Sequence, residues 1–534
     1  MGLATPLFLW SHGIQSLNGC DESFYAQMAR EMFISGDWLS PRFLGELFFE
    51  KPPLLVWLIT LSYHLAGVDV WAARLPGILS ALLCIPLVGW IGRQFLNFRA
   101  AALGMAVLPL SYLWVQQGRL VGQDIPLTAL ELLGVAALIA GIQGQPLGFW
   151  IMGLALGLGL LMKSAMILLV GVALLPFLIV QTRINILLKP SWLRSSHFWG
   201  GLLAGIGLFA LWLGVSIGLH GSMVWRSLIG KVVDLGSEGF HATNTWSYYL
   251  WHIPAHGFPW TVLALVGFFL LLRGQPSRNV LIWSLPLTFF LELQFFATRT
   301  HYYTVQLYPW LALLAGVTVD QAMHRWSERG MDLRSQVHLA QWLSWGLAML
   351  GFLLLGVGLA VIAQVAPLQI LAGHGLALVI VGILYLLLPL IWIWRRVVHH
   401  AAWIWLVFLL LASTITLGSI IHRPDFGNAN PALAQLQQRW SDHLDRDTPV
   451  DVGRSGVADV CQAQAHAFYT PTPGTWIEDQ DLIAGDFRSH LWLSPVQLEE
   501  FPWVQERFNL ETVLEVNDWQ LCQRTSAGNL PRTQ

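Results

Sequence analysis

Long apolar stretches recur along most of the chain, and they leave few folds open to it. A helix needs about 20 apolar residues to cross the hydrocarbon core of a bilayer. Only 11% of the residues are charged and 55% are hydrophobic, which excludes a soluble globular enzyme, a disordered chain and a basic nucleic-acid binder. The sequence therefore predicts an all-α polytopic membrane domain with about 13 transmembrane helices. The stretches run near residues 3–17, 71–96, 100–118, 125–142, 147–162, 164–181, 198–219, 258–273, 279–296, 302–319, 341–364, 373–394 and 402–421.

A further apolar stretch, residues 53–67, is short and begins with two prolines. Basic residues gather in cytoplasmic loops. The basic loops of this chain fall on one side only if residues 53–67 lie along the membrane surface rather than crossing. This topology gives thirteen spans, with long external loops at residues 18–70 and 220–257 and an external C-terminus. The cytoplasmic residues would be Arg93, Arg99, Arg183, Lys189, Arg194, Arg273, Arg278, Arg325, Arg329, Arg334, Arg395 and Arg396.

The composition changes sharply after residue 421. Residues 422–534 hold 8 Arg, no Lys and 16 acidic residues, whereas residues 1–421 carry a net charge of +6. We therefore predict a membrane domain over residues 1–421 and an external soluble α/β domain over residues 422–534. Within the second part, "SHLWLS" and "ETVLEVNDWQLCQR" alternate like strands. Between them, Ser494 to Gln497 forms a capping box with Pro495 at the first helical position, which predicts a helix to about Phe508.

Charged residues also accumulate at the external ends of the predicted spans. Such groups are costly at a membrane edge unless they are paired or functional. A carboxylate can deprotonate an attacking hydroxyl, and Lys or Arg can hold a phosphate. The sequence therefore predicts a polar cavity beneath the two long loops, suited to a lipid-phosphate substrate. The residues are Asp21, Glu22, Glu50, Lys51, Arg74, Asp124, Lys163, Lys231 and Arg299.

Several of these residues, and His241 in the second long loop, also have a simpler interpretation. Asp21 and Glu22 could cap a helix predicted from Asp21 to Ser35, which ends at Gly36. Lys51, Arg74 and Lys163 could be anchors at the membrane edge, and His241 could be an interfacial histidine. A transporter or flippase for a lipid-linked substrate would also need a charged cavity. Such proteins often contain repeats with matching broken helices, and the sequence has no evident repeat.

The first external loop resembles a known family signature. It reads "DESFYAQMAREMFISGDWLSPRFLGELFFEKPPLLVWL" and is similar to the polytopic GT-C glycosyltransferases that use polyprenyl-phosphate sugars. These include the protein O-mannosyltransferases and the aminoarabinose transferases that modify lipid A, and the second branch is the more similar. The resemblance continues through "AARLPG", "LMKSA", "WSYYL", "FPW" and "HYYTVQLYPWLALLAG", and covers most of residues 20–320.

The resemblance implies a role for each matching residue. Asp21 matches the catalytic acid, Asp124 a second external acid that helps to shape the site, and Lys51 the lysine that contacts the donor phosphate. Glu50 completes an acid–lysine pair with Lys51. The remaining predicted substrate-binding residues are Glu22, Arg74, Lys163, Lys231, His241, Arg299, His301 and Tyr302.

The function expected from this pattern is transfer of a sugar from a polyprenyl monophosphate to an envelope acceptor, with inversion at the anomeric carbon. The acceptor could be lipid A, a protein hydroxyl or another glycan. No cofactor is certain, although Glu50 or His241 could contribute to a divalent metal site. The expected partners are the lipid-linked donor, the acceptor and membrane lipids, without nucleic acid. The expected location is the bacterial inner membrane, with the active site and the tail on the periplasmic side.

The chain contains four cysteines. Cys461 and Cys522 both lie in the tail, and a disulfide between them is the first expectation, with two buried free thiols as the alternative. Cys20 and Cys84 lie at or in the membrane domain and are expected to be poor partners.

Overall fold

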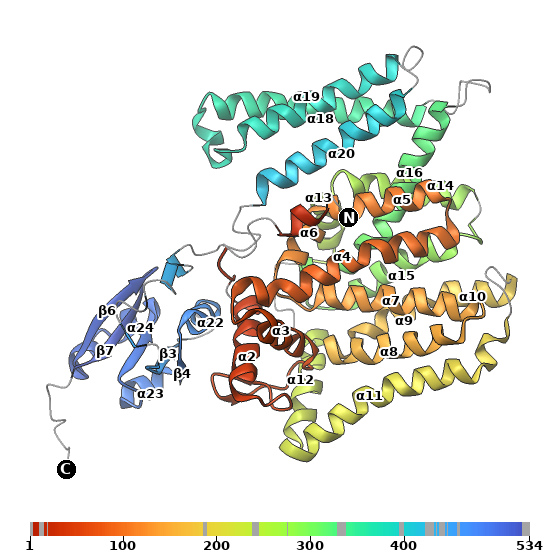
Figure 1. Ribbon diagram of the computed structural model, residues 1–534. Coiled ribbons are helices and arrows are strands. Elements are labelled where there is room, and N and C mark those ends of the chain that lie inside the picture. Colours follow the sequence, from red (N-terminus) through yellow and green to blue (C-terminus); the bar gives the residue numbers. More distant parts are fainter. Residues whose placement is uncertain are drawn as a thin grey trace.

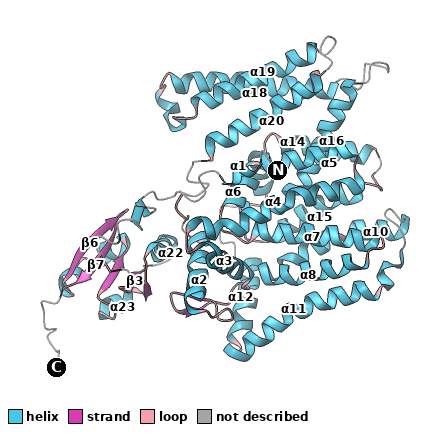
Figure 2. Cartoon of the chain, in the orientation of Figure 1, coloured by secondary structure: helices cyan, strands magenta, loops and turns pink. Residues whose placement is uncertain are grey.

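The fold is a large helical bundle with a small sheet domain attached at one end (Figure 1). A computed structural model describes residues 4–9, 15–18, 20–184, 190–237, 245–274, 276–327, 338–394 and 400–421 of the chain. In the C-terminal part it describes residues 432–433, 435–436, 440, 444–445, 447–455 and 460–525. Helices make up nearly all of the bundle, and most of the strands gather in the C-terminal domain (Figure 2).

The bundle is that of a multi-pass membrane protein. Within the described residues, six helical stretches are long and apolar enough to cross a membrane: Val70–Phe95 (α4), Asp124–Ile142 (α7), Pro146–Ile184, Ser196–His220 (α11), Ala340–Ile362 in α18 (His338–Ile362) and Ala401–Ile420 (α20). Two bent pairs raise this number to eight: Phe98–Leu110 with Tyr112–Arg119, and Tyr248–His256 with Trp260–Arg273. The remaining apolar helices include Val280–Phe295 (α15), Tyr308–Ser327 (α16) and Gly375–Trp394 (α19).

The predicted number of thirteen spans is not confirmed. The first predicted span, residues 3–17, is described as helix only over Ala4–Leu9 (α1), and residues 10–14 lie outside the described residues. The stretch over residues 100–118 bends by 59° between its two helices, and α15 has only 16 residues. The apolar pattern marks where membrane helices occur, whereas bends and breaks within them depend on packing.

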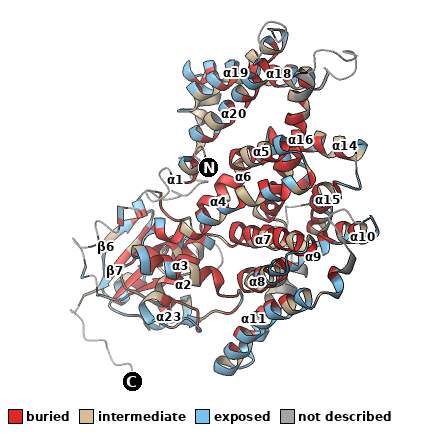
Figure 3. Ribbon diagram, turned by 45° about the vertical axis from the view of Figure 1, so that its right-hand side comes forward, coloured by how far each residue is buried: buried red, intermediate tan, exposed pale blue. Residues whose placement is uncertain are grey.

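Burial separates the centre of the bundle from its periphery (Figure 3). In α7, 78% of the most apolar stretch is buried, whereas the corresponding value for α11 is 17%. In a membrane protein an exposed apolar helix surface faces lipid, so α7 is a central helix and α11 a peripheral one.

Helices α7 and α8 (Pro146–Lys163) form a hairpin that places two predicted site residues at one end. Their backbones approach closely: a Cβ at Gly148 would lie 2.5 Å from the carbonyl oxygen of Ala137. Small residues allow such approach between membrane helices. Asp124 begins α7 and Lys163 ends α8, so the antiparallel hairpin brings the two side chains together.

Residues 18–70, the predicted first external loop, contain two helices that pack on each other. The predicted helix Asp21–Ser35 (α2) is confirmed, and it ends at Gly36 in the left-handed conformation. Leu54–Ala66 (α3) has 13 residues, which is short for a span. The Tyr63 hydroxyl of α3 donates to the carbonyl of Ala26 in α2 at 3.2 Å. Between these helices lies a short two-stranded ribbon, Arg42–Phe43 (β1) and Glu46–Leu47 (β2).

The C-terminal domain is α/β, as predicted. Its five strands have the order β4-β3-β5-β7-β6, with Val450–Gly453 (β3) parallel to both neighbours and the last three strands antiparallel. The other strands are Pro473–Ile477 (β4), His490–Leu493 (β5), Leu510–Val516 (β6) and Trp519–Arg524 (β7). The helices include Val460–Tyr469 (α22) and Asp479–Ala484 (α23).

The capping box at Ser494 is present, and Gln497 completes it. The helix that follows does not run unbroken to Phe508. It consists of Pro495–Glu500 (α24) and Val504–Arg507 (α25). Pro502 lies between them, and the residue before a proline is disfavoured in the helical conformation.

The C-terminal domain docks against α2 through α22. Nη1 of Arg30 donates to the carbonyls of Phe468 at 3.0 Å and Thr470 at 2.6 Å. The Tyr469 hydroxyl accepts from the backbone N–H of Leu17 at 2.8 Å. The C-terminal domain therefore packs directly against the first external loop.

The predicted Cys461–Cys522 disulfide is wrong. Cys461 pairs with Cys20, across 441 residues of sequence, while Cys522 and Cys84 are buried free thiols. Cys522 lies on β7 opposite Leu491 of β5, inside the sheet core, whereas Cys461 lies in α22 against α2. Cys20 immediately precedes α2, and α22 of the C-terminal domain docks against α2, so the fold brings Cys20 next to Cys461.

Candidate active site

One cavity of about 720 Å³ collects most of the residues that the sequence predicted for the site. Its walls come from the first external loop, from α6 (Tyr112–Arg119) and the start of α7, from the turn after α8, from α12 (Met223–Ser237) and from the segment before α16. The predicted residues among its lining are Asp21, Glu22, Glu50, Lys51, Asp124, Lys163, Lys231, His301 and Tyr302.

Asp21 and Lys51 form an ion pair at the cavity surface. The distance from Nζ of Lys51 to Oδ1 of Asp21 is 3.2 Å, and the aspartate side chain is 54% exposed because it faces the cavity. Asp21 is the first residue of α2, where the helix dipole favours a negative charge. The Lys51 ammonium also lies 4.8 Å from the ring centre of Tyr25, one helical turn after Asp21.

The surroundings keep this pair charged. Burial within the cavity walls acts to raise the pKa of Asp21, but attraction to Lys51, with smaller contributions from Lys163 and Lys231, holds that pKa below its ordinary value. Burial works against the charge of Lys51, and Tyr25 and Asp21 outweigh it, so the pKa of Lys51 is raised. Asp21 is therefore a carboxylate that can accept a proton or a hydrogen bond at neutral pH.

Asp124 and Lys163 form a second, more buried pair. Their closest atoms are 2.6 Å apart, and the side chains are 10% and 15% exposed. The Lys163 ammonium lies 4.8 Å from the ring centre of Tyr303 and 5.6 Å from that of Tyr302. This lysine is held in one position by a carboxylate and two aromatic rings.

Glu50 and Lys231 form a third pair, with a distance of 3.2 Å between Oε2 and Nζ. The carboxylate is 46% exposed and the ammonium-bearing side chain 26%. Among the described residues, no group of three or more His, Cys, Asp and Glu side chains could hold a metal ion. His241 lies outside the described residues, so a metal site near Glu50 or His241 stays a prediction.

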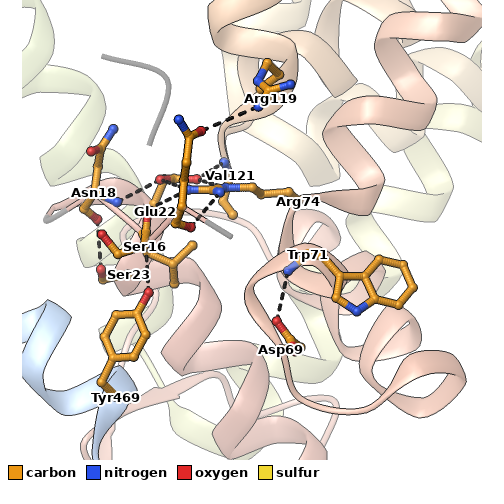
Figure 4. Close-up of polar contacts among 12 residues, drawn as sticks. Ser16, Asn18, Glu22, Ser23, Asp69, Trp71, Arg74, Arg119, Val121 and Tyr469 are labelled. Carbon is orange, nitrogen blue, oxygen red and sulfur yellow. Dashed lines mark hydrogen bonds and ion pairs between the residues drawn. The ribbon is translucent and has the colours of Figure 1, made fainter. Parts of the chain in front are cut away.

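Glu22 and Arg74 form a buried ion pair beside the cavity (Figure 4). The Arg74 guanidinium is fully buried and donates to both carboxylate oxygens of Glu22, at 2.9 and 3.0 Å. It also donates to the carbonyls of Gln15 and Ser16. Arg74 is not part of the cavity lining, so the structure does not bring it together with the other predicted site residues, and its contact with substrate stays a prediction.

The Glu22 carboxylate is equally occupied. It accepts hydrogen bonds from the backbone N–H groups of Asn18 and Val121, both at 2.8 Å. It therefore ties the start of the first external loop to the segment between α6 and α7. Although Glu22 borders the cavity, its hydrogen bonds make it a support for the site.

His301 lies on the cavity wall, with Nε2 3.5 Å from the side-chain nitrogen of Gln117. Arg299 is not part of the lining, and its guanidinium donates to the carbonyl of Gln294 at 3.1 Å. The structure therefore brings His301 to the cavity but leaves Arg299 beside it.

Sequence reasoning missed several lining residues. Tyr25 lines the cavity, and its spacing of four residues from Asp21 puts both on one face of α2. Gln116, Gln117 and Gln123 also line the cavity. Glutamine carries no charge and has no distinctive spacing here, so no sequence signal marked these residues.

Known proteins share both the sequence pattern and the architecture. Residues 50–214 match the family model described as dolichyl-phosphate-mannose-protein mannosyltransferase. An undecaprenyl phosphate-α-4-amino-4-deoxy-L-arabinose arabinosyl transferase of Pseudomonas fluorescens is 30% identical over 308 residues, or 54% of this chain and 50% of the relative. The crystal structure of ArnT from Cupriavidus metallidurans bound to undecaprenyl phosphate superimposes with a TM-score of 0.77, at 18% identity, over 98% of this chain and 97% of that one.

This chain has the ArnT fold. The resemblance to glycosyltransferases that use polyprenyl-phosphate sugars is thereby confirmed. A more distant neighbour with the same general architecture is the oligosaccharyltransferase of Archaeoglobus fulgidus, with a TM-score of 0.51 and 11% identity over 94% of this chain and 69% of that one. The sequence match covers about half the length of the P. fluorescens relative.

Proposed function

We propose that this protein is a membrane glycosyltransferase that moves a sugar from a polyprenyl monophosphate to an acceptor of the bacterial envelope. The observation that carries the proposal is the convergence of Asp21, Asp124 and three lysines on one cavity within an ArnT fold. The relatives' names point to 4-amino-4-deoxy-L-arabinose as the first sugar to test. We propose lipid A as the first acceptor, because the family signature in the first loop is closest to that branch.

The chemistry follows from the charges of the cavity. The donor would lose a polyprenyl phosphate as its leaving group, and this anion is weakly basic, so it needs no general acid. Lys51 and Lys231 line the cavity and would stabilise its charge. Asp21 would accept the proton of an acceptor hydroxyl as that oxygen attacks the anomeric carbon from the opposite side, which inverts its configuration.

An acceptor phosphate would change the role of Asp21. A phosphate oxygen is already ionised at neutral pH and needs no base. Asp21 would then orient the attack, and its substitution would cost less than it would with a hydroxyl acceptor. The size of that effect therefore distinguishes the two kinds of acceptor.

We also propose that the cavity opens on the periplasmic side. The basic residues that we assign to the cytoplasmic loops include Arg273 and Arg278. The cavity residues belong to the alternate loops, on the opposite side of the membrane. Ser277→Cys should be shielded from an impermeant thiol reagent in intact inner-membrane vesicles of right-side-out orientation, while Glu511→Cys in the tail should react. The opposite pattern would reverse the topology.

A transfer assay with purified protein tests the enzymatic proposal. The full chain is incubated with undecaprenyl-phosphate aminoarabinose and lipid A, and the products are identified by mass spectrometry. Lys51→Ala should lower turnover roughly a hundredfold, while Lys51→Arg keeps part of it because the positive charge remains. Movement of the lipid across a membrane without sugar transfer would instead support a flippase. Equal turnover in both variants and wild type would remove Lys51 from the phosphate site.

A further inference from the structure

All three lysines that line the cavity among the described residues already have a carboxylate partner. Lys51 contacts Asp21 at 3.2 Å, Lys231 contacts Glu50 at 3.2 Å, and Lys163 contacts Asp124 at 2.6 Å. A phosphate that enters the cavity competes with these carboxylates for the same cations. The arrangement of the empty cavity therefore differs from the one that a bound anion requires.

The three pairs differ in how readily they can separate. The carboxylates of Asp21 and Glu50 are 54% and 46% exposed, whereas that of Asp124 is 10% exposed. An exposed ion pair is worth little because water screens it and competes for both partners. The Asp21 and Glu50 pairs are thus the two that a stronger anion can displace, and the Asp124 pair is the one that stays.

The two exchangeable pairs are also linked in sequence. Glu50 and Lys51 are neighbours in the chain. Lys231 of α12 pairs with Glu50, and Asp21 in the first turn of α2 pairs with Lys51, so both pairs lie at the same short segment. A phosphate dianion between Lys51 and Lys231 would replace one carboxylate on each side.

We propose that donor phosphate binds by exchange: it displaces the carboxylates of Asp21 and Glu50 from Lys51 and Lys231, and this releases Asp21 to face the acceptor. The inference rests on the proposed function and specifies how the same site is regulated. The Asp21 carboxylate is the resting counter-ion of the phosphate-binding lysine, and it becomes available for catalysis only when the donor is present.

The exchange also changes the strength of Asp21 as a base. In the empty cavity, Lys51 is the main group that lowers the pKa of Asp21, and a carboxylate with a low pKa is a weak base. A phosphate bound to Lys51 neutralises that attraction and makes Asp21 more basic. The base is strengthened at the moment when a sugar is in position to be transferred.

Exchange predicts an unusual effect on affinity. Asp21→Asn removes the competitor for Lys51, so undecaprenyl phosphate should bind the full-length variant in nanodiscs roughly two- to fivefold more tightly than wild type. Glu50→Gln should act in the same direction. The matched control is Glu46→Gln, which removes one negative charge from the same loop at an exposed position outside the cavity, and its affinity should equal that of wild type.

A double variant separates exchange from simple repulsion between Asp21 and phosphate. If Asp21 acts through Lys51, the double variant Asp21→Asn/Lys51→Ala should bind undecaprenyl phosphate no more tightly than Lys51→Ala alone. Absence of measurable binding in both variants also fits this expectation. A gain in affinity that persists without Lys51 would overturn the exchange. Unchanged or weaker binding in Asp21→Asn would also overturn it, while leaving the proposed function intact. Failure of wild type to bind undecaprenyl phosphate would overturn the proposed function and the exchange with it.

Discussion

The cavity and the C-terminal domain use their charged residues in opposite ways. In the cavity, Asp21 is half exposed and its partner Lys51 comes from 30 residues away. In the C-terminal domain, Asp451 is 1% exposed and accepts hydrogen bonds from the backbone N–H groups of Thr475 and Arg488 and from the Arg488 guanidinium. An accessible carboxylate with one weak partner can change partners, whereas a buried carboxylate with several cannot.

This difference predicts where substitutions affect chemistry and where they affect stability. In the cavity, loss of a charge should change turnover without unfolding the chain. In the C-terminal domain and at its junction with α2, loss of a buried polar group should lower stability without a direct effect on the reacting groups. The adjacent residues Asp21 and Glu22 test the comparison most directly, because one faces the cavity and the other is buried against Arg74.

The largest expected effect is on turnover in Asp21→Asn. Removal of a general base lowers the rate by a factor of about 10²–10⁴. The melting temperature should stay close to that of wild type, since Asp21 is half exposed and makes one ion pair. Turnover is measured by mass spectrometry of the product and stability by thermal unfolding of the purified chain. Near-normal turnover would exclude Asp21 as the base, and a large fall in melting temperature would break the comparison.

Arg74→Ala should have the largest effect on stability. Removing one partner of a buried ion pair leaves the Glu22 carboxylate without its charge partner and costs about 3–5 kcal/mol. Arg183→Ala, which removes an exposed arginine of the bundle, is the matched control and should have little effect. Thermal unfolding measures both. A stable Arg74→Ala protein that has lost only donor binding would contradict this structural role and support the prediction that Arg74 contacts substrate.

The Cys20–Cys461 disulfide should stabilise the docking of the tail. Cys461→Ser should cost about 2–4 kcal/mol, and wild type under reducing conditions should lose a similar amount, while the variant should be insensitive to reductant. Non-reducing peptide mapping should recover Cys20 and Cys461 in one linked species and Cys522 as a free thiol. Recovery of a Cys461–Cys522 peptide would reinstate the sequence-based pairing.

The smallest effect concerns pH and His466. Burial lowers the pKa of His466 to about 4, and the ring stacks on Trp519 with 4.5 Å between ring centres. Below about pH 6.5, the ordinary pKa of about 6.5 lets His466 bind a proton in the unfolded chain, while the ring stays neutral in the folded chain. The free energy of unfolding therefore falls as the pH drops from about 6.5 to 4, by about 3 kcal/mol at most.

Hydrogen exchange of peptides from β5 and β7 in the full chain measures this effect. Protection in wild type should fall across that pH range, and His466→Gln should remove part of the dependence. An identical pH dependence in wild type and variant would show that His466 is not responsible.

Local patterns account for the parts of this protein that could be predicted from its sequence. Apolar runs placed the membrane helices, a change in charge composition marked the C-terminal domain, and a capping box located the start of α24. Charged residues beside apolar runs identified seven lining residues of the cavity, and the family resemblance added His301 and Tyr302. The apolar runs and the capping box depend on residues close together in the sequence, and the charged residues stand out because a charge next to lipid is costly. These patterns can therefore be recognised without knowledge of the tertiary structure.

Only the tertiary structure decided how those residues are paired. Asp21 and Glu22 are chemically similar neighbours, and their different roles follow from the side of α2 that each one faces. Cys461 bonds to Cys20 rather than to Cys522 because docking of α22 on α2 joins segments 441 residues apart. The sequence determined which groups had to be paired, since unpaired charges are costly at a membrane edge. Distances between segments remote in the chain decided which partner each group received.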